Sequence, residues 1–485
     1  MLFNSYIFIF LFLPVCLVGY YILQKKSSML TKLWLIGCSL WFYGYFNLSY
    51  LLIMLGSVAI NYLIYSLIRR GNKQKLFFIC GIVVNLGVLF YFKYYDFFIE
   101  NVNAVFKVDI ALKHILLPLG ISFFTFQQIS FLYDVYKGEI RKIGLVDYSL
   151  FVTFFPQLIA GPIVTGQEML PQFAGIGSNS FDADRFQRGI VVFTGGLFKK
   201  VLIADTFAKA VDYGFSNLNG INATEAMLVM LFYTIQLYFD FSGYCDMAIG
   251  IGKMFGIDIA LNFNSPYKAA NIVEFWKRWH ITLSRFFTKN VYIPLGGNRR
   301  GVARTYINTF IIFFLSGLWH GAGWNFVIWG CMHGIMYILT KMWLSKIKRG
   351  NKFSHIIGVI VTFIFVNVAW VFFRAPSVNE AALLIKTMLA GQWAIPAEIF
   401  AEGFNLGEMW YVMKILHIAN LPFARYYLMV LFAVVTLIIT FCAPNIHEAE
   451  QKMKFNSFSA IIVGALLVWC IVSLSGVSTF LYFNF

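Results

Sequence analysis

Two histidines lie inside otherwise apolar segments, and each is followed directly by glycine. His320 stands within residues 316–325 and His333 within 329–334. An ionisable side chain in an apolar span is costly, so such residues are functional candidates by default. A buried neutral imidazole can take the proton of a hydroxyl as that hydroxyl attacks a thioester carbonyl. The pattern fits acyl transfer, and a histidine merely hydrogen-bonded to a neighbour is the alternative for either one alone.

His320 is the preferred base of the two. Trp319 and Trp324 flank it with bulk that would exclude water from a thioester, whereas we expect His333 to be mainly structural. Glycine after each histidine suggests a close approach of another group to the imidazole. Trp319 and Asn325 also join the candidate substrate-binding residues.

A third histidine lies in residues 271–285, where charged and aromatic side chains alternate as in a helix at the membrane surface. Trp276 and Trp279 would be its interface anchors. Glu274 and Arg278 are four apart and can pair. We expect His280 to orient substrate near the aqueous surface, with Trp276, Arg278 and Arg285 in substrate binding.

Arginines and carboxylates elsewhere add further candidates. Arg299 and Arg300 follow a Gly-Gly turn in a loop, where they suit the phosphates of a bound anion, although topology alone explains arginines there. Asp240 and Asp246 lie in an apolar helix. Asp240 is a candidate for substrate binding, and the alternative is that each carboxylate caps a broken helix or pairs with an arginine.

These residues need a membrane scaffold to position them. The chain has 485 residues, of which 60% are hydrophobic and 12% charged. A soluble domain cannot hide that much apolar surface. Crossing the hydrocarbon takes about 20 apolar residues. The sequence predicts one all-α polytopic membrane domain over residues 1–485 with about 10 to 12 transmembrane or re-entrant helices, and the first of them is retained rather than cleaved.

The net charge of +16 is best explained by topology, not nucleic acid, because the basic residues occupy short loops beside apolar spans. Loops near 25–32, 69–75, 141–142 and 341–352 would be cytoplasmic, which places both termini outside. Residues 376–424 would lie along the outer surface, with a capping box at Ser377–Glu380 before an amphipathic helix, or as a plain loop. Surplus positive charge would attract anionic lipid or a polyanionic substrate.

The chain resembles the membrane-bound O-acyltransferase family, in its bacterial branch of alginate O-acetyltransferase membrane subunits. The motifs that carry the resemblance extend over a core of about 110–375. They are residues 276–284, 292–300 and 318–323, supported by 117–127, 154–162, 238–244 and 370–374.

The resemblance implies a ring of tilted helices around a thin central funnel, with His320 at the position of the family histidine and His280 second. It also implies a bacterial inner membrane enzyme that passes acetyl from cytoplasmic acetyl-CoA towards an extracytoplasmic polysaccharide such as alginate or peptidoglycan. Such relatives work with an extracytoplasmic or membrane-anchored acetyltransferase partner. No permanently bound cofactor and no metal are implied, and arginines 278, 285, 299 and 300 become candidates for binding the CoA phosphates.

Three alternatives remain open from the sequence. The polar funnel also suits a transporter or flippase of a lipid-linked glycan, although no internal repeat is visible. A D-alanyl transfer protein shares the Arg-Trp-His stretch at 278–280, whereas residues 293–299 are closer to the acetyltransferase branch. An inactive scaffold is the third. Turnover of labelled acetyl-CoA separates an acetyltransferase from a transporter and from an inactive scaffold.

Overall fold

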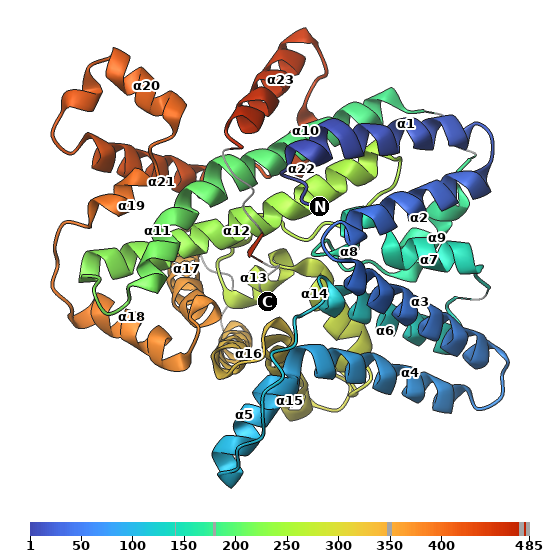
Figure 1. Cartoon of the computed structure of the whole chain (residues 1–485). Helices are drawn as coiled ribbons and strands as arrows, with labels where there is room; N and C mark the ends of the chain where they lie inside the picture. The colour runs from blue at the N-terminus through green and yellow to red at the C-terminus, as the bar shows by residue number, and fades with distance from the viewer. Residues whose placement is uncertain (141, 178–180, 347–351, 475–479, 482–485) are drawn as a thin grey trace.

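The computed structural model describes the chain except for residues 141, 178–180, 347–351, 475–479 and 482–485. Within the described residues all regular elements are helices (Figure 1). The predicted all-α class is confirmed. Three basic residues used to predict the topology, Arg141, Lys348 and Arg349, lie outside the described residues.

Seven helices of the described chain are long and apolar enough to cross a membrane, and two shorter apolar stretches are Phe8–Gln24 and Ser457–Val472. These helices confirm a multi-pass membrane protein. The predicted number of 10 to 12 helices counted re-entrant stretches together with full spans. The seven are α3 (Leu48–Arg69), the run of α4 (Gln74–Leu89), η2 (Phe90–Tyr94) and α5 (Tyr95–Phe106), α12 (Ala223–Met254), α15 (Val302–His320), α16 (Trp324–Leu344), α17 (Lys352–Arg374) and α21 (Ala424–Cys442).

Helix α12 runs through the middle of the molecule and packs along α10 (Ala183–Phe198) (Figure 1). A Cβ on Gly243 would lie 2.8 Å from the carbonyl oxygen of Gly196, and one on Gly196 would lie 2.6 Å from that of Gly243. Glycine allows the two backbones this close approach, as small residues do between membrane helices. The central helix is therefore held rigidly against its neighbour.

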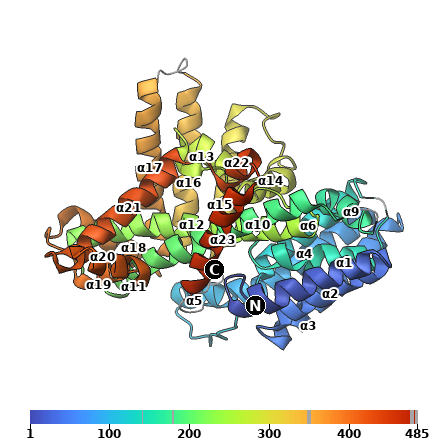
Figure 2. The ribbon, with the colours of Figure 1, turned by 90° about the horizontal axis from the view of Figure 1, so that it is seen from above.

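Two groups of helices flank this pair (Figures 1 and 2). On one side α1 (Leu13–Gln24), α2 (Ser28–Gly44), α3 and α4 follow each other as neighbours, and α4 packs on α6 (Ile121–Tyr136). On the other side α15, α16, α17 and α18 (Val378–Ala390) pack in chain order, and α17 and α18 both contact α12. This arrangement brings α15 and α17 towards the centre.

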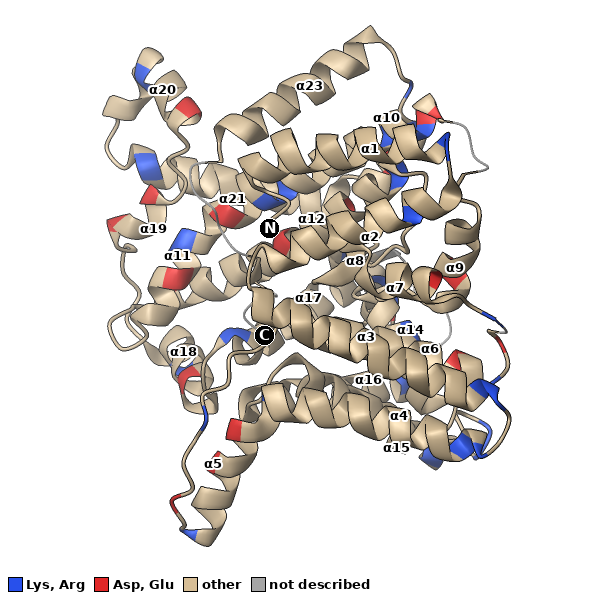
Figure 3. Cartoon of the chain, turned by 45° about the vertical axis from the view of Figure 1, so that its right-hand side comes forward, with Lys and Arg blue, Asp and Glu red and all other residues tan. Residues whose placement is uncertain are grey.

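Charged residues gather mainly at helix ends and in loops (Figure 3), but three acidic residues of α12 are buried, Glu225 in its first turn and Asp240 and Asp246 further along. Asp240 pairs with Lys200 at 2.7 Å and Asp246 with Lys199 at 2.6 Å, both lysines coming from η3 (Lys199–Ala204). Pairing offsets the cost of removing each charge from water. The sequence left pairing with arginine open, and the partners are lysines.

Residues 376–424 contain α18, α19 (Glu398–Glu402) and α20 (Gly407–Ile415). The predicted cap is confirmed, because the Ser377 hydroxyl accepts from the Glu380 N–H at 3.2 Å and donates to its carboxylate at 3.0 Å. The location of this segment on the outer surface stays a prediction.

The single surface helix predicted for 271–285 is wrong. The structure has two short helices, α13 (Ile272–Arg278) and α14 (Ile281–Phe287), and between them His280 adopts the left-handed conformation with φ of 46°. Trp276 and Trp279 are 7% and 1% exposed, so they pack inside the protein instead of anchoring it at the interface. The break turns His280 inward.

Candidate active site

Two imidazoles from distant parts of the chain meet at the centre of the molecule. His320 ends α15 and His280 lies at the break before α14, with ring centroids 6.2 Å apart. They are 2% and 0% exposed, so the expected aqueous location of His280 is wrong. Trp319, Trp329 and Phe373 surround His320, with ring centroids 4.8 to 5.0 Å away. The pair therefore lies in a dry aromatic pocket.

Burial lowers the pKa of His280 to about 3, because the imidazolium form loses its hydration there. The ring is neutral at physiological pH. Its Nδ1 lies 3.1 Å from the Asn262 side-chain oxygen. A neutral, oriented imidazole is suited to accept a proton during acyl transfer.

His333 has a different environment. Its Nδ1 accepts a hydrogen bond from the Trp276 indole N–H at 3.2 Å, and its ring is 0% exposed. Trp329 lies between it and His320, with centroids 4.9 Å from His333 and 5.0 Å from His320. This arrangement supports the prediction that His333 is structural.

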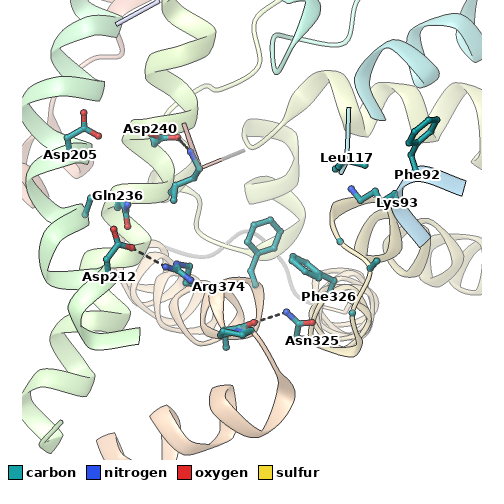
Figure 4. Close-up of a pocket in the computed structure, with 18 of the residues that line it drawn as sticks. Phe92, Lys93, Leu117, Asp205, Asp212, Gln236, Asp240, Asn325, Phe326 and Arg374 are labelled. Atoms are coloured by element: carbon teal, nitrogen blue, oxygen red, sulfur yellow. Dashed lines mark hydrogen bonds and ion pairs between the residues drawn. The ribbon is translucent and has the colours of Figure 1, made fainter. Parts of the chain in front are cut away.

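A cavity of about 750 Å³ lies beside the C-terminal end of α15 (Figure 4). Gly321, directly after His320, and Phe373 both line it. Asp205, Asp212 and Asp240 lie at one end and Lys93 at the other. We name it the carboxylate cavity, and its polar lining includes Asp205, Asp212, Gln236, Asp240, Asn325 and Arg374.

The lining of a second cavity, of about 560 Å³, includes Ser316, one turn before His320, and Ile281, directly after His280. Close neighbours of the histidines along the chain thus line both cavities, although neither imidazole is itself a lining residue. The central funnel stays a prediction. We name this one the basic cavity, because its charged lining residues are Lys277, Arg285, Lys289 and Lys341.

Four predicted substrate-binding residues line these cavities, Asp240 and Asn325 the carboxylate cavity and Trp276 and Arg285 the basic cavity. Asp240 already accepts the backbone N–H of Leu481 at 3.0 Å. The Asn325 amide donates to the carbonyl oxygen of Ala375 at 2.8 Å.

Arg285 binds the Glu168 carboxylate through two hydrogen bonds, at 2.7 and 3.1 Å. Burial alone would raise the pKa of Glu168, but the guanidinium outweighs it and the pKa lies below its usual value. A ligand of the basic cavity must compete with this pair.

The other predicted arginines lie outside the lining of both cavities. Arg278 pairs with Glu274 at 2.7 Å, as predicted, and Arg299 and Arg300 are exposed in the loop before α15. Trp319 stacks on Phe126, with centroids 5.2 Å apart, and forms part of the wall beside His320. The Phe326 ring packs closely against the glycine after His320, because a Cβ there would lie 2.1 Å from that ring.

The sequence reasoning missed Lys93 and Asn262. The Lys93 ammonium donates to the carbonyl oxygens of Trp319 at 2.6 Å and His320 at 3.1 Å. Lys93 is a cation within an apolar stretch, and a charge in such a stretch marks a candidate functional residue, so the sequence alone could have identified it. Asn262 lies in a turn-like stretch, where nothing in the sequence marks its contact with His280. Among the described residues no cluster of three or more His, Cys, Asp or Glu side chains is placed to hold a metal ion.

Comparison with known proteins gives several extensive matches. A model described as MBOAT, membrane-bound O-acyltransferase family, matches residues 134–378. The chain is 40% identical to the peptidoglycan O-acetyltransferase of Helicobacter pylori, over 100% of this chain and 98% of that protein. It is 39% identical to the probable alginate O-acetylase of Pseudomonas aeruginosa, over 81% and 76%. It is 30% identical to the teichoic acid D-alanyltransferase of Bacillus subtilis, over 51% and 66%.

Proposed function

We propose that this chain, which belongs to the membrane-bound O-acyltransferase family, passes acetyl groups from cytoplasmic acetyl-CoA to an extracytoplasmic polysaccharide. The family predicted from the sequence is confirmed, and the chain is an O-acyltransferase. The observation that carries the proposal is the pair of buried imidazoles, whose neighbours along the chain line a carboxylate cavity (Gly321) and a basic cavity (Ile281).

In the proposed reaction His320 is the general base. An acceptor hydroxyl in the carboxylate cavity loses its proton to His320 while its oxygen bonds to the thioester carbonyl carbon. The carbon–sulfur bond breaks, the thiolate leaves with the electron pair, and the imidazolium returns the proton to it. The aromatic walls around His320 exclude water, which would otherwise hydrolyse the thioester.

The basic cavity is the proposed donor site, because Lys277, Arg285, Lys289 and Lys341 suit the phosphates of CoA. The exposed Arg299 and Arg300 would attract the donor from outside this cavity. Replacing both by Gln should raise KM for acetyl-CoA, more so at low salt because exposed charges are screened. An unchanged KM would leave these two arginines with a topological role only.

Peptidoglycan is the acceptor class that we favour, because the match to the Helicobacter enzyme covers both chains almost completely. Alginate is the second candidate, supported by a match over 81% of the chain. We also propose inner-membrane location with both termini outside, and a separate extracytoplasmic or membrane-anchored transferase that receives the acetyl group.

The test uses cells that lack the gene and carry either the natural chain or the His320→Ala variant. Ester-bound acetate is released by mild alkali from purified peptidoglycan and from exopolysaccharide and is then quantified. We expect the natural chain alone to restore acetate on peptidoglycan. If acetate is restored only on exopolysaccharide, the acceptor is exopolysaccharide and not peptidoglycan. If acetate is restored on neither polymer, the proposed function is overturned.

A further inference from the structure

The side chain of Asn262 connects three donors at the break that carries His280. Its oxygen lies 3.1 Å from His280 Nδ1, accepts the Thr282 backbone N–H at 3.2 Å and accepts the Thr282 hydroxyl at 3.0 Å. The Asn262 backbone carbonyl accepts the N–H of Ile281 at 3.0 Å. This one residue therefore holds the whole turn from His280 to Thr282.

The hydrogen-bond pattern fixes which atom of the Asn262 amide faces His280. A backbone N–H can only donate, so the atom that meets the Thr282 N–H is the amide oxygen. The Thr282 hydroxyl accepts the Ile163 N–H at 3.0 Å, which leaves its own hydrogen for the same oxygen. The Asn262 NH₂ group points the other way, towards the Cys245 sulfur at 3.4 Å.

An amide oxygen cannot donate, so the hydrogen between it and His280 belongs to Nδ1. A neutral imidazole carries one ring hydrogen, and with that hydrogen on Nδ1 the lone pair lies on Nε2. We propose that Asn262 is a positioning residue which fixes His280 in this tautomer and so makes Nε2 a proton acceptor. The proposal rests on the acetyl transfer function proposed above and assigns His280 a defined part in it.

Burial strengthens the assignment, because Asn262 and His280 are 0% exposed and Thr282 is 1% exposed. Water does not compete for these hydrogen bonds, and the low pKa of His280 keeps the ring neutral. Two titratable groups face it from packed elements, the His320 imidazole on α15 and, through Asn262, the Cys245 thiol on α12.

The hydrogen bond from His280 Nδ1 to the Asn262 oxygen also suits the protonated, positively charged form of His280. When Nε2 takes up the proton that His320 has accepted from the acceptor hydroxyl, the Nδ1–H remains donated to Asn262. Neither the turn nor the amide has to move, so the proton is accepted without reorganisation of the site. The proton then leaves with the CoA thiol, and His280 returns to its neutral tautomer.

The experiment compares Asn262→Asp and Asn262→Leu by acetyl transfer against pH. Aspartate keeps an acceptor for Nδ1–H but adds negative charge, which raises the pKa of His280. We expect its kcat to approach the natural value at high pH, with the acid limb of the profile moved up by about one pH unit or more. Leucine removes the acceptor, and we expect kcat at least tenfold lower at every pH with an unchanged KM for acetyl-CoA.

Asn61→Asp is the matched control. Asn61 is also a buried asparagine, but it pairs with Asn85 between α3 and α4, so a carboxylate there should leave the pH profile unchanged. A natural pH profile for Asn262→Asp, or equal losses for both Asn262 variants at all pH values, would overturn the proposal. If the Asn262→Leu variant does not fold, the pH profile of Asn262→Asp alone tests the proposal.

A second measurement does not depend on turnover. Nitrogen NMR of histidine-labelled protein in lipid reports which ring nitrogen carries hydrogen, and a His280→Gln variant identifies the signal. We expect a protonated Nδ1 and a bare Nε2. The opposite tautomer refutes the role of Asn262, whereas the expected tautomer in a chain without acetyl transfer refutes only the proposed function.

Discussion

At the scale of single residues, three buried histidines differ in what their ring atoms contact. His333 accepts from the Trp276 indole and His280 contacts Asn262, whereas His320 packs among Trp319, Trp329 and Phe373 and is followed by Gly321, which lines the carboxylate cavity. Equal burial thus does not imply an equal role. The contacts favour His320 and His280 for proton transfer and His333 for packing.

Replacing His320 by Ala should lower the rate of acetyl transfer by about 100-fold to 10,000-fold, the usual cost of losing a general base. His333→Ala is the comparison, because it leaves the Trp276 indole N–H without a buried acceptor, at a cost of about 1–3 kcal/mol in stability. We expect the His333→Ala variant to unfold at a lower temperature than the natural chain, and we expect its kcat to fall far less than that of His320→Ala. Near-normal turnover by His320→Ala would refute the proposed mechanism.

At the scale of elements, the last turn of α15, which carries His320, is held by a π-helical turn within another membrane helix. Lys93 and Tyr94 of η2 bind the last carbonyls of α15, the Tyr94 hydroxyl donating to Leu318 at 2.7 Å and Lys93 to Trp319 and His320. The last carbonyls of a helix lack partners within it, and a cation there also favours the helix dipole. Such π-helical turns occur frequently at functional sites.

Lys93→Met should therefore displace His320 and lower kcat by about tenfold to a hundredfold, because small misplacements of reacting groups are costly. Lys93→Arg keeps the positive charge and should recover part of the activity. Tyr94→Phe removes one hydrogen bond, to Leu318, and should have a smaller effect. Initial rates at saturating acetyl-CoA check this, and natural kcat in Lys93→Met would show that η2 does not position the histidine.

At the scale of the whole molecule, both ends of the chain approach the same part of α12. The Phe3 and Phe480 rings have centroids 4.9 and 4.8 Å from the Tyr244 ring. Phe480 also contacts Lys200, which lines the carboxylate cavity, with the ammonium 4.7 Å from the ring centroid. Phe480 and Leu481 thus lie beside the carboxylate cavity, and Phe3 reaches the same stretch of α12.

A reporter that works only in the cytoplasm should give no signal when it is fused after Phe485. The physical reason is the positive-inside rule, which predicts that the basic loops near 25–32 and 69–75 are cytoplasmic and therefore that both termini are outside. The same reporter inserted after Gly71, in the loop between α3 and α4, is the positive control. A strong signal at Phe485 would reverse the orientation and the direction of transfer.

The sequence by itself determined the membrane class, the family and two chemical candidates, His320 and His280. Hydrophobic length and charge placement are properties of the chain alone, because the bilayer imposes them on every span. The pairing of Glu274 with Arg278 and the cap at Ser377 were also predictable, since both are interactions between residues close in sequence.

Only the tertiary structure decided which distant residues share the site. A helical pattern over 271–285 cannot reveal a left-handed His280, because Asn262, Thr282 and the packing of α14 stabilise that conformation. Lys93 reaches His320 across 227 positions of sequence. Lys199 and Lys200, not arginines, neutralise two buried carboxylates of α12. In each case a buried polar group found its partner through folding, and sequence spacing carries no record of that contact.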